Sequence, residues 1–103
     1  MTGRADWTNS ETNALFEAVL SLENREEAEQ FFRDLCTLRE LGEMATRWQA
    51  VRLLVNGIPY RQVAETTGAS TATVTRIAQW LRHGTGGYRT VLDRLGLGPE
   101  VEA

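Results

Sequence analysis

The sequence has few of the residues that disulfides, metal sites and membrane spans require. It has one cysteine, Cys36, and one histidine, His83, in 103 residues. A single cysteine cannot form an internal disulfide, and neither residue has a cluster of ligands around it to hold a metal ion. No apolar run approaches the roughly 18 residues of a membrane span, and the first residues lack a secretory signal pattern. We therefore expect a cytoplasmic protein with no membrane partner, no metal and no cofactor.

The sequence also lacks a pattern typical of catalysis. His83 lies in the glycine-rich stretch "HGTGG" without an acidic neighbour in sequence, and Cys36 has no base near it. The carboxylates of Glu26, Glu27 and Glu29 fall near the start of a predicted helix, where they stabilise the helix dipole. We therefore expect that the protein is not an enzyme.

Lysine is absent, and all eleven basic residues are arginines. Arginine suits bidentate contact with phosphate and guanine, although a compositional bias of the genome gives the same pattern. The net charge of −3 hides an uneven distribution: residues 1–46 carry four arginines and ten carboxylates, whereas residues 47–95 carry seven arginines and two carboxylates. An acidic first half followed by a basic second half is typical of a protein with a nucleic-acid face on one side.

Hydrophobic periodicity predicts helices in the first half of the chain. In three pairs a small polar residue precedes a glutamate by three positions, the spacing of a helix capping box. The pairs are Thr8 and Glu11, Asn24 and Glu27, and Thr37 and Glu40. They predict a helix over about residues 9–22, a second ending near Cys36 and a third opening after Thr37. Around Ala45 and Thr46 we expect a bend or a break.

Glycines divide the second half into further helices. The expected elements are "TRWQAVRLLVNG" ended by Gly57, a short helix from Pro59 to Gly68, a helix from Ser70 to about Arg82, and a helix over 87–95 ended by Gly96. The sequence shows no strand-like alternation and no repeat. It predicts one all-α domain over 1–103 with about six helices, a flexible arm over 1–8 and a loose tail over 96–103.

Residues 60–79 have the pattern of a helix-turn-helix. Two short helices cross closely when the contact residues are small and the turn permits a positive φ, which Ala64 and Gly68 provide. The apolar residues of the shared core are then Val63, Ala69, Val74 and Ile77. Thr67 departs from the pattern, because a larger apolar residue is more usual before the glycine. An αα-corner of an ordinary helical bundle is the alternative interpretation.

The outward face of the second helix carries groups that read base edges or bind phosphates. For base contact we expect Thr71, Ala72, Thr75 and Gln79. For phosphate contact we expect Ser70, Arg76 and Arg82, with Arg61 of the preceding helix in support. Free N–H groups at the start of the second helix add an anion site. The predicted partner is double-stranded DNA.

The segment from about Leu35 to Leu95 resembles the Trp repressor superfamily, and most closely its short, uncharacterised YerC/YecD branch. The residues that carry the resemblance are "LCTLRELGEMATRW" and "LLVNGIPYRQVAETTGASTATVTR". The resemblance implies an intertwined homodimer in which helices over 9–58 wrap together and residues 59–83 form the helix-turn-helix. It also implies a regulator of transcription, a repressor, acting on a near-palindromic operator. Burial of Phe16, Phe31, Phe32 and Trp48 across the subunit interface then stabilises a small chain.

The same resemblance implies an effector pocket. Arg47 and Arg76 match the two arginines that flank the bound tryptophan, and Thr37 and Thr73 match polar positions of that pocket. Ile77 stands where the family has glycine, and Trp80 stands where it has a small serine. Overfilling a packed site costs about 1 to 3 kcal/mol. We therefore expect that L-tryptophan is not the corepressor, that Trp80 occupies the slot itself, and that any effector is a different small molecule.

A helical protein–protein interaction module is the alternative function. An antirepressor or a dimerisation partner without DNA binding would fit the acidic first half of the chain. The two functions predict different dependence on salt. A DNA-binding protein that neutralises several phosphates loses affinity for DNA steeply as the salt concentration rises.

Overall fold

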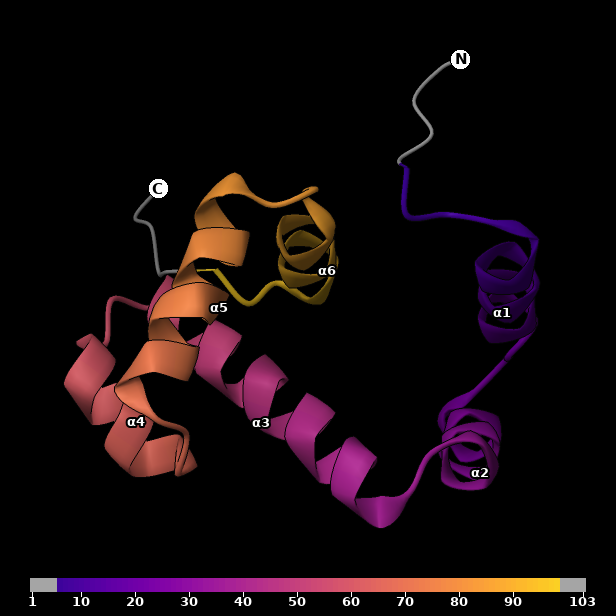
Figure 1. Ribbon diagram of the computed structural model, residues 1–103, viewed down its shortest axis with the longest axis horizontal. Helices are drawn as coiled ribbons and strands as arrows, with labels where there is room; N and C mark the ends of the chain where they lie inside the picture. Colours follow the sequence, from indigo (N-terminus) through magenta and orange to yellow (C-terminus); the bar gives the residue numbers. More distant parts are fainter. Residues whose placement is uncertain (1–5, 99–103) are drawn as a thin grey trace. The chain divides into compact units, whose positions relative to one another are not determined.

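The computed structural model describes residues 6–98 as an arrangement of helices. In chain order these are α1 (Ser10–Leu20), α2 (Arg25–Leu35), α3 (Leu38–Val55), α4 (Tyr60–Thr67), α5 (Thr71–His83) and α6 (Gly87–Leu95) (Figure 1). No strand is present among these residues, so the predicted all-α class with about six helices is confirmed. Most of the predicted arm and tail, residues 1–5 and 99–103, lies outside the described residues. Within the described range, no helix is long and apolar enough to span a membrane.

The chain divides into two compact units, the first ending at Leu41 and the second beginning at Gly42. In the first unit neither α1 nor α2 buries a residue. Its aromatic rings make local edge-on contacts, with centroids 5.9 Å apart for Trp7 and Phe16 and 5.5 Å apart for Phe31 and Phe32. Its exposed large apolar side chains are Trp7, Leu15, Phe16, Leu20, Leu35 and Leu38. A single copy of this unit therefore has no core of its own.

The start of α1 differs from the sequence prediction by one residue. Asn9, not Thr8, is the N-cap: its Oδ1 accepts a hydrogen bond from Thr12 N at 2.9 Å, and its own N–H donates to Thr12 Oγ1 at 2.8 Å. The predicted capping of this helix by Thr8 is therefore wrong. Asparagine and threonine form the same reciprocal box one position later, and spacing alone does not rank two adjacent candidates.

The other two predicted caps are confirmed. Glu27 N donates to Asn24 Oδ1 at 2.9 Å and so fixes the start of α2. At the start of α3, Thr37 N donates to Glu40 Oε1 at 2.8 Å and Glu40 N donates to Thr37 Oγ1 at 3.0 Å. Each bond satisfies an N–H group near a helix start, where the helix supplies no acceptor.

α3 runs unbroken through Ala45 and Thr46, where the sequence suggested an interruption. Neither residue is a glycine or a proline, and the nearest glycine, Gly42, has open space around it. A lone glycine lowers helix stability by only about 1 kcal/mol. Burial of Ala50 and Val51 in the second half of α3 fixes the helix against its neighbours.

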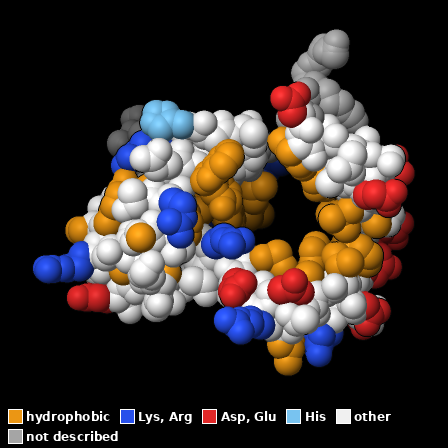
Figure 2. Space-filling view, in the orientation of Figure 1, with side chains coloured by type: hydrophobic (Ala, Val, Ile, Leu, Met, Phe, Trp, Pro, Cys, Tyr) orange, Lys and Arg blue, Asp and Glu red, His pale blue; other side chains and the backbone are white. Residues whose placement is uncertain are grey.

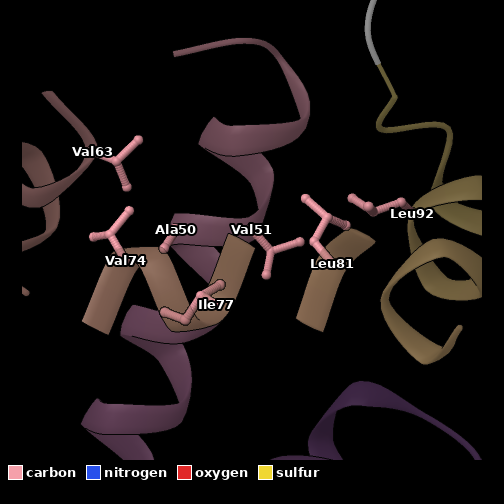
Figure 3. Close-up of a cluster of buried hydrophobic side chains, with 7 residues drawn as sticks. All are labelled: Ala50, Val51, Val63, Val74, Ile77, Leu81 and Leu92. Carbon is pink, nitrogen blue, oxygen red and sulfur yellow. The ribbon is translucent and has the colours of Figure 1, made fainter. Parts of the chain in front are cut away.

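The core of the second unit joins four helices. Its buried residues are Ala50 and Val51 from α3, Val63 from α4, Val74, Ile77 and Leu81 from α5, and Leu92 from α6. In Figure 3, Val63 and Val74 face each other, and Leu81 meets Leu92. The predicted shared core of Val63, Val74 and Ile77 is confirmed, with Ala69 half-buried against it.

The turn between α4 and α5 depends on Gly68 and Thr67. Gly68 has φ +82°, in the left-handed region, and its N–H donates to Ala64 O at 2.9 Å. The Thr67 hydroxyl donates to Val63 O at 2.8 Å and accepts from Ala69 N at 3.2 Å. A larger apolar residue cannot make these two bonds. Thr67 thus satisfies backbone groups of the turn, which explains its departure from the usual pattern.

We expect Gly68→Ala to destabilise the protein by about 1 to 2 kcal/mol, because a side chain is strained at positive φ. No atom lies within 4 Å of the added Cβ, so the cost is conformational and not a clash. The matched control is Gly87→Ala, which is also in open space but at ordinary φ in the first turn of α6. It should stabilise by roughly 0.5 kcal/mol. Urea unfolding at one fixed protein concentration measures both, and equal effects would contradict the strain at Gly68.

Candidate nucleic-acid interface

α5 has one buried face and one exposed face. Val74, Ile77, Ala78 and Leu81 are buried in the core. All the residues predicted to contact DNA are exposed: Arg61, Ser70, Thr71, Ala72, Thr75, Arg76, Gln79 and Arg82. Because α4 and α5 pack together across the Gly68 turn, the exposed face of α5 is held in a fixed orientation on the second unit.

The N-terminus of α5 has backbone N–H groups that can donate hydrogen bonds to an anion. Ser70 is the N-cap, and its Oγ accepts from Thr73 N at 3.1 Å. The first turn contains no acidic residue. In the helical pattern the N–H groups of Thr71 and Ala72 have no acceptor inside the helix, and the helix dipole adds positive potential there. A phosphate oxygen can accept from these groups.

The hydroxyl of Thr75 is partly engaged within the helix. Its Oγ1 donates to Thr71 O at 2.9 Å. The Thr75 oxygen can therefore still accept a hydrogen bond, and its methyl group is free for apolar contact. The oxygen can accept a hydrogen bond from the amino group of adenine or cytosine, and the methyl group can contact the methyl group of thymine.

The arginines of this surface are not neutralised by carboxylates. Among the described residues, no carboxylate lies within 4.0 Å of Arg61, Arg76 or Arg82. On the face drawn in Figure 2, most acidic side chains lie over α1 and α2, whereas the charged side chains visible over α4 and α5 are mostly arginines. The second unit therefore presents positive charge although the whole chain has a net charge of −3.

Arg82 has a structural partner that sequence reasoning missed. Its Nη2 donates to the Tyr60 hydroxyl at 2.6 Å, and its Cζ lies 5.8 Å from the centroid of the Tyr60 ring. The two residues are 22 positions apart, so no local spacing indicates the contact.

Five of the six predicted effector-pocket residues line one cavity of about 410 Å³: Arg47, Thr73, Arg76, Ile77 and Trp80. The sixth, Thr37, is not brought to this cavity and serves as the N-cap of α3 in the first unit. Tyr88 of α6 completes the lining and was not predicted. Its ring centroid lies 6.3 Å from that of Trp48, again a contact between distant parts of the sequence.

The two bulky residues of the pocket have different environments. Ile77 is only 5% exposed and belongs to the core, whereas Trp80 is 61% exposed. The Trp80 ring lies against Gly84, where an added Cβ would be 2.8 Å from Trp80 Cε3. Trp80 also lines a neighbouring, more apolar cavity of about 480 Å³ with Trp48 and Tyr88. Trp80 therefore lines both of these cavities.

The exposed surface of α4 and α5 carries polar and charged binding groups. Among residues 6–98, no group of three or more histidine, cysteine or acidic side chains is placed to hold a metal ion. The available groups are hydroxyls, guanidinium groups, free helix N–H groups and an amide. These groups recognise phosphates and base edges.

Comparison with known proteins agrees with this geometry. The profile of the Trp repressor protein family matches residues 10–96. The uncharacterised protein YerC of Bacillus subtilis (strain 168) is 41% identical over 85 residues, which is 82% of each chain.

Two solved structures are similar in fold and sequence. A crystal structure of a candidate Trp repressor from Staphylococcus aureus has a TM-score of 0.83 and 38% identity, covering 89% of this chain and 92% of that one. A TrpR-like protein from Eubacterium eligens ATCC 27750 has a TM-score of 0.82 and 39% identity, covering 86% and 92%. The helix-turn-helix, the family match and these relatives together show that this chain belongs to the Trp repressor family.

Proposed function

We propose that the protein is a sequence-specific DNA-binding regulator that represses transcription as a homodimer. The observation that carries the proposal is the division of α5 into a buried apolar face and an exposed face of hydroxyl, amide and guanidinium groups. Membership of the Trp repressor family supports DNA-binding regulation as the class of function.

The dimensions and chemistry of α5 suit the major groove. Its 13 residues extend about 20 Å, and an α-helix fits a groove about 12 Å wide. Thr71, Ala72, Thr75 and Gln79 contact bases in this proposal. Phosphates are bound by Ser70, Arg76 and Arg82, with Arg61 at the start of α4.

The incomplete burial of the first unit supports the proposed homodimer. α1 and α2 bury no residue, and Leu20 is 83% and Leu38 66% exposed. A second copy that covers these side chains supplies the hydrophobic contact that one copy lacks. Twofold symmetry then places two α5 helices about 34 Å apart, in successive major grooves of a near-palindromic operator.

Regulation does not use L-tryptophan in this proposal. The cavity contains Arg47 and Arg76, which suit an anionic group, and the bulky side chains of Ile77 and Trp80 also line it. Its volume of about 410 Å³ falls within the range of small-molecule pockets. An effector that differs from tryptophan in shape remains compatible with the lining.

We expect Thr71→Ala and Arg76→Ala to weaken operator binding by roughly ten- to a hundredfold, because each removes a base or phosphate contact. The operator is first obtained by selecting bound fragments from genomic DNA with the purified protein. Fluorescence anisotropy then measures affinity, with Arg94→Ala of α6 as a control that removes the same charge outside the interface. Unchanged binding by both α5 variants would show that α5 is not the reading helix.

The affinity of the wild type should fall steeply with salt, with a log–log slope near −0.9 for each phosphate neutralised. Titration at several salt concentrations measures the slope. Absence of salt-sensitive binding to any duplex would instead favour a helical protein–protein interaction module. The acidic first unit, with its exposed apolar side chains, would then bind the protein partner.

We expect Leu35→Glu to shift the protein from dimer to monomer. Leu35 is 51% exposed in one chain and lies in the apolar stripe of α2, so a buried charge there disfavours association. Gln30→Glu adds the same charge at an exposed polar position of α2 and should leave the dimer intact. Sedimentation velocity distinguishes the two states, and a wild type that sediments as a monomer would refute the homodimer.

L-tryptophan should neither bind saturably nor change DNA affinity. Ile77 and Trp80 stand where the family has glycine and serine, so the cavity beside Arg76 differs in shape from the slot that holds an indole. Isothermal titration of the protein with L-tryptophan and operator binding at millimolar L-tryptophan check the two parts. Tight, saturable binding would show that the pocket accommodates the indole.

A further inference from the structure

We propose that Tyr60, Arg82 and Arg89 form a second binding site for a DNA phosphodiester, in which Tyr60 positions Arg82. The proposal rests on the proposed function, since its ligand is the DNA backbone. These residues line one cavity of about 380 Å³, and apolar side chains from the end of α3 and the turn after it form much of the remaining lining.

Tyr60 restrains the Arg82 guanidinium in two ways. The hydrogen bond from Nη2 to the Tyr60 hydroxyl is 2.6 Å long, and the guanidinium carbon lies 5.8 Å from the ring centroid. Both residues sit at helix ends, Tyr60 at the start of α4 and Arg82 one residue before the end of α5. An exposed arginine otherwise samples many rotamers, and this contact selects one before DNA binds.

The hydrogen-bonding capacity of the pair matches a phosphodiester. Arg82 has five N–H donors and uses one on Tyr60, so the others remain available. The Tyr60 oxygen accepts that bond, which leaves its own O–H as a donor strengthened by the neighbouring cation. A phosphodiester offers only acceptors, and two of its oxygens carry the negative charge. The pair therefore offers donors where DNA offers acceptors.

The charge at this cavity is not balanced by protein groups. Arg82 and Arg89 both line it, and no acidic residue does. Asp93 lies one turn after Arg89 on α6, yet no carboxylate among the described residues is within 4.0 Å of either arginine. Two like charges beside one cavity repel each other, and a bound anion offsets this repulsion because it attracts both arginines.

The cavity is placed to bind a phosphate of one DNA strand while the start of α5 binds a phosphate of the other strand. Arg82 lies 12 residues after Ser70, about 18 Å along the helix. The phosphates that flank the major groove are separated by a groove about 12 Å wide. Ser70 and Arg82 can therefore bind phosphates on the two sides of one groove, which fixes the angle at which α5 enters it.

The test is a double-mutant cycle in the full chain, read as affinity for operator and for an unrelated duplex. We expect Arg82→Ala to weaken binding roughly tenfold and Tyr60→Phe, which removes only the hydroxyl, roughly threefold. In the Arg82→Ala background Tyr60→Phe should add nothing, because its effect acts through Arg82. Arg89→Ala should weaken binding roughly threefold, whereas Arg94→Ala, which removes a charge from the same helix outside the cavity, should not.

Two further readouts separate phosphate binding from a structural role. The losses should be equal for both duplexes, unlike that of Thr71→Ala, and the salt slope of an Arg82→Ala dimer should be shallower by about 1.8. Three results would each overturn the site. They are an equal loss of DNA affinity by Tyr60→Phe in both backgrounds, an unchanged salt slope for Arg82→Ala, and an Arg89→Ala affinity equal to that of Arg94→Ala. If the wild type binds no duplex, the proposed function fails as well; if it binds and only these variants are silent, this site alone fails.

Discussion

The packing of α5 against α3 is the contact on which the rest of the second unit depends. Val74, Ile77 and Leu81 pack with Ala50 and Val51, so one side of α5 is fixed by burial. Ala50 and Val51 supply the α3 part of this buried cluster, and the opposite side of α5 remains free of core contacts. The helix backbone that carries the exposed hydroxyl and guanidinium groups thereby acquires a fixed direction. The proposed reading of bases by α5 requires this division, because a helix that moved against its core could not discriminate bases.

The same helix is anchored at both ends by polar contacts. At its start, Ser70 caps the helix and the Thr67 hydroxyl satisfies the turn before it. At its end, Arg82 is bonded to Tyr60, and Gly84 allows the Trp80 ring to lie close to the backbone. These contacts do not bury much surface. They limit fraying at the two ends of α5, which carry the groups that we propose bind phosphates.

The sequence was sufficient to predict features that depend on local spacing. The six helices, the caps at Asn24 and Thr37, and the burial of Val63, Val74 and Ile77 all follow from patterns within one or two helical turns. The α1 cap was displaced by one residue because two adjacent residues can serve. Tyr60 and Tyr88 were missed because their partners are supplied by the fold and not by neighbours in sequence. The arginines and Trp80 of the cavity came from resemblance to a family, since no spacing rule joins Arg47 to Thr73.

Ile77 connects the cavity to the reading surface in physical terms. It is a core residue of α5 and also lines the cavity that contains Arg47 and Arg76. A molecule bound there contacts the helix from the side that fixes its direction, while Arg76 faces both the cavity and the exposed surface. A ligand changes a conformational equilibrium only by contacting two states differently. A bulky side chain at position 77 ties α5 to the core more strongly than glycine would, which reduces the movement left for a ligand to control. Ile77 thus favours an α5 that is held in place by the core, as the proposed reading of DNA without a corepressor requires.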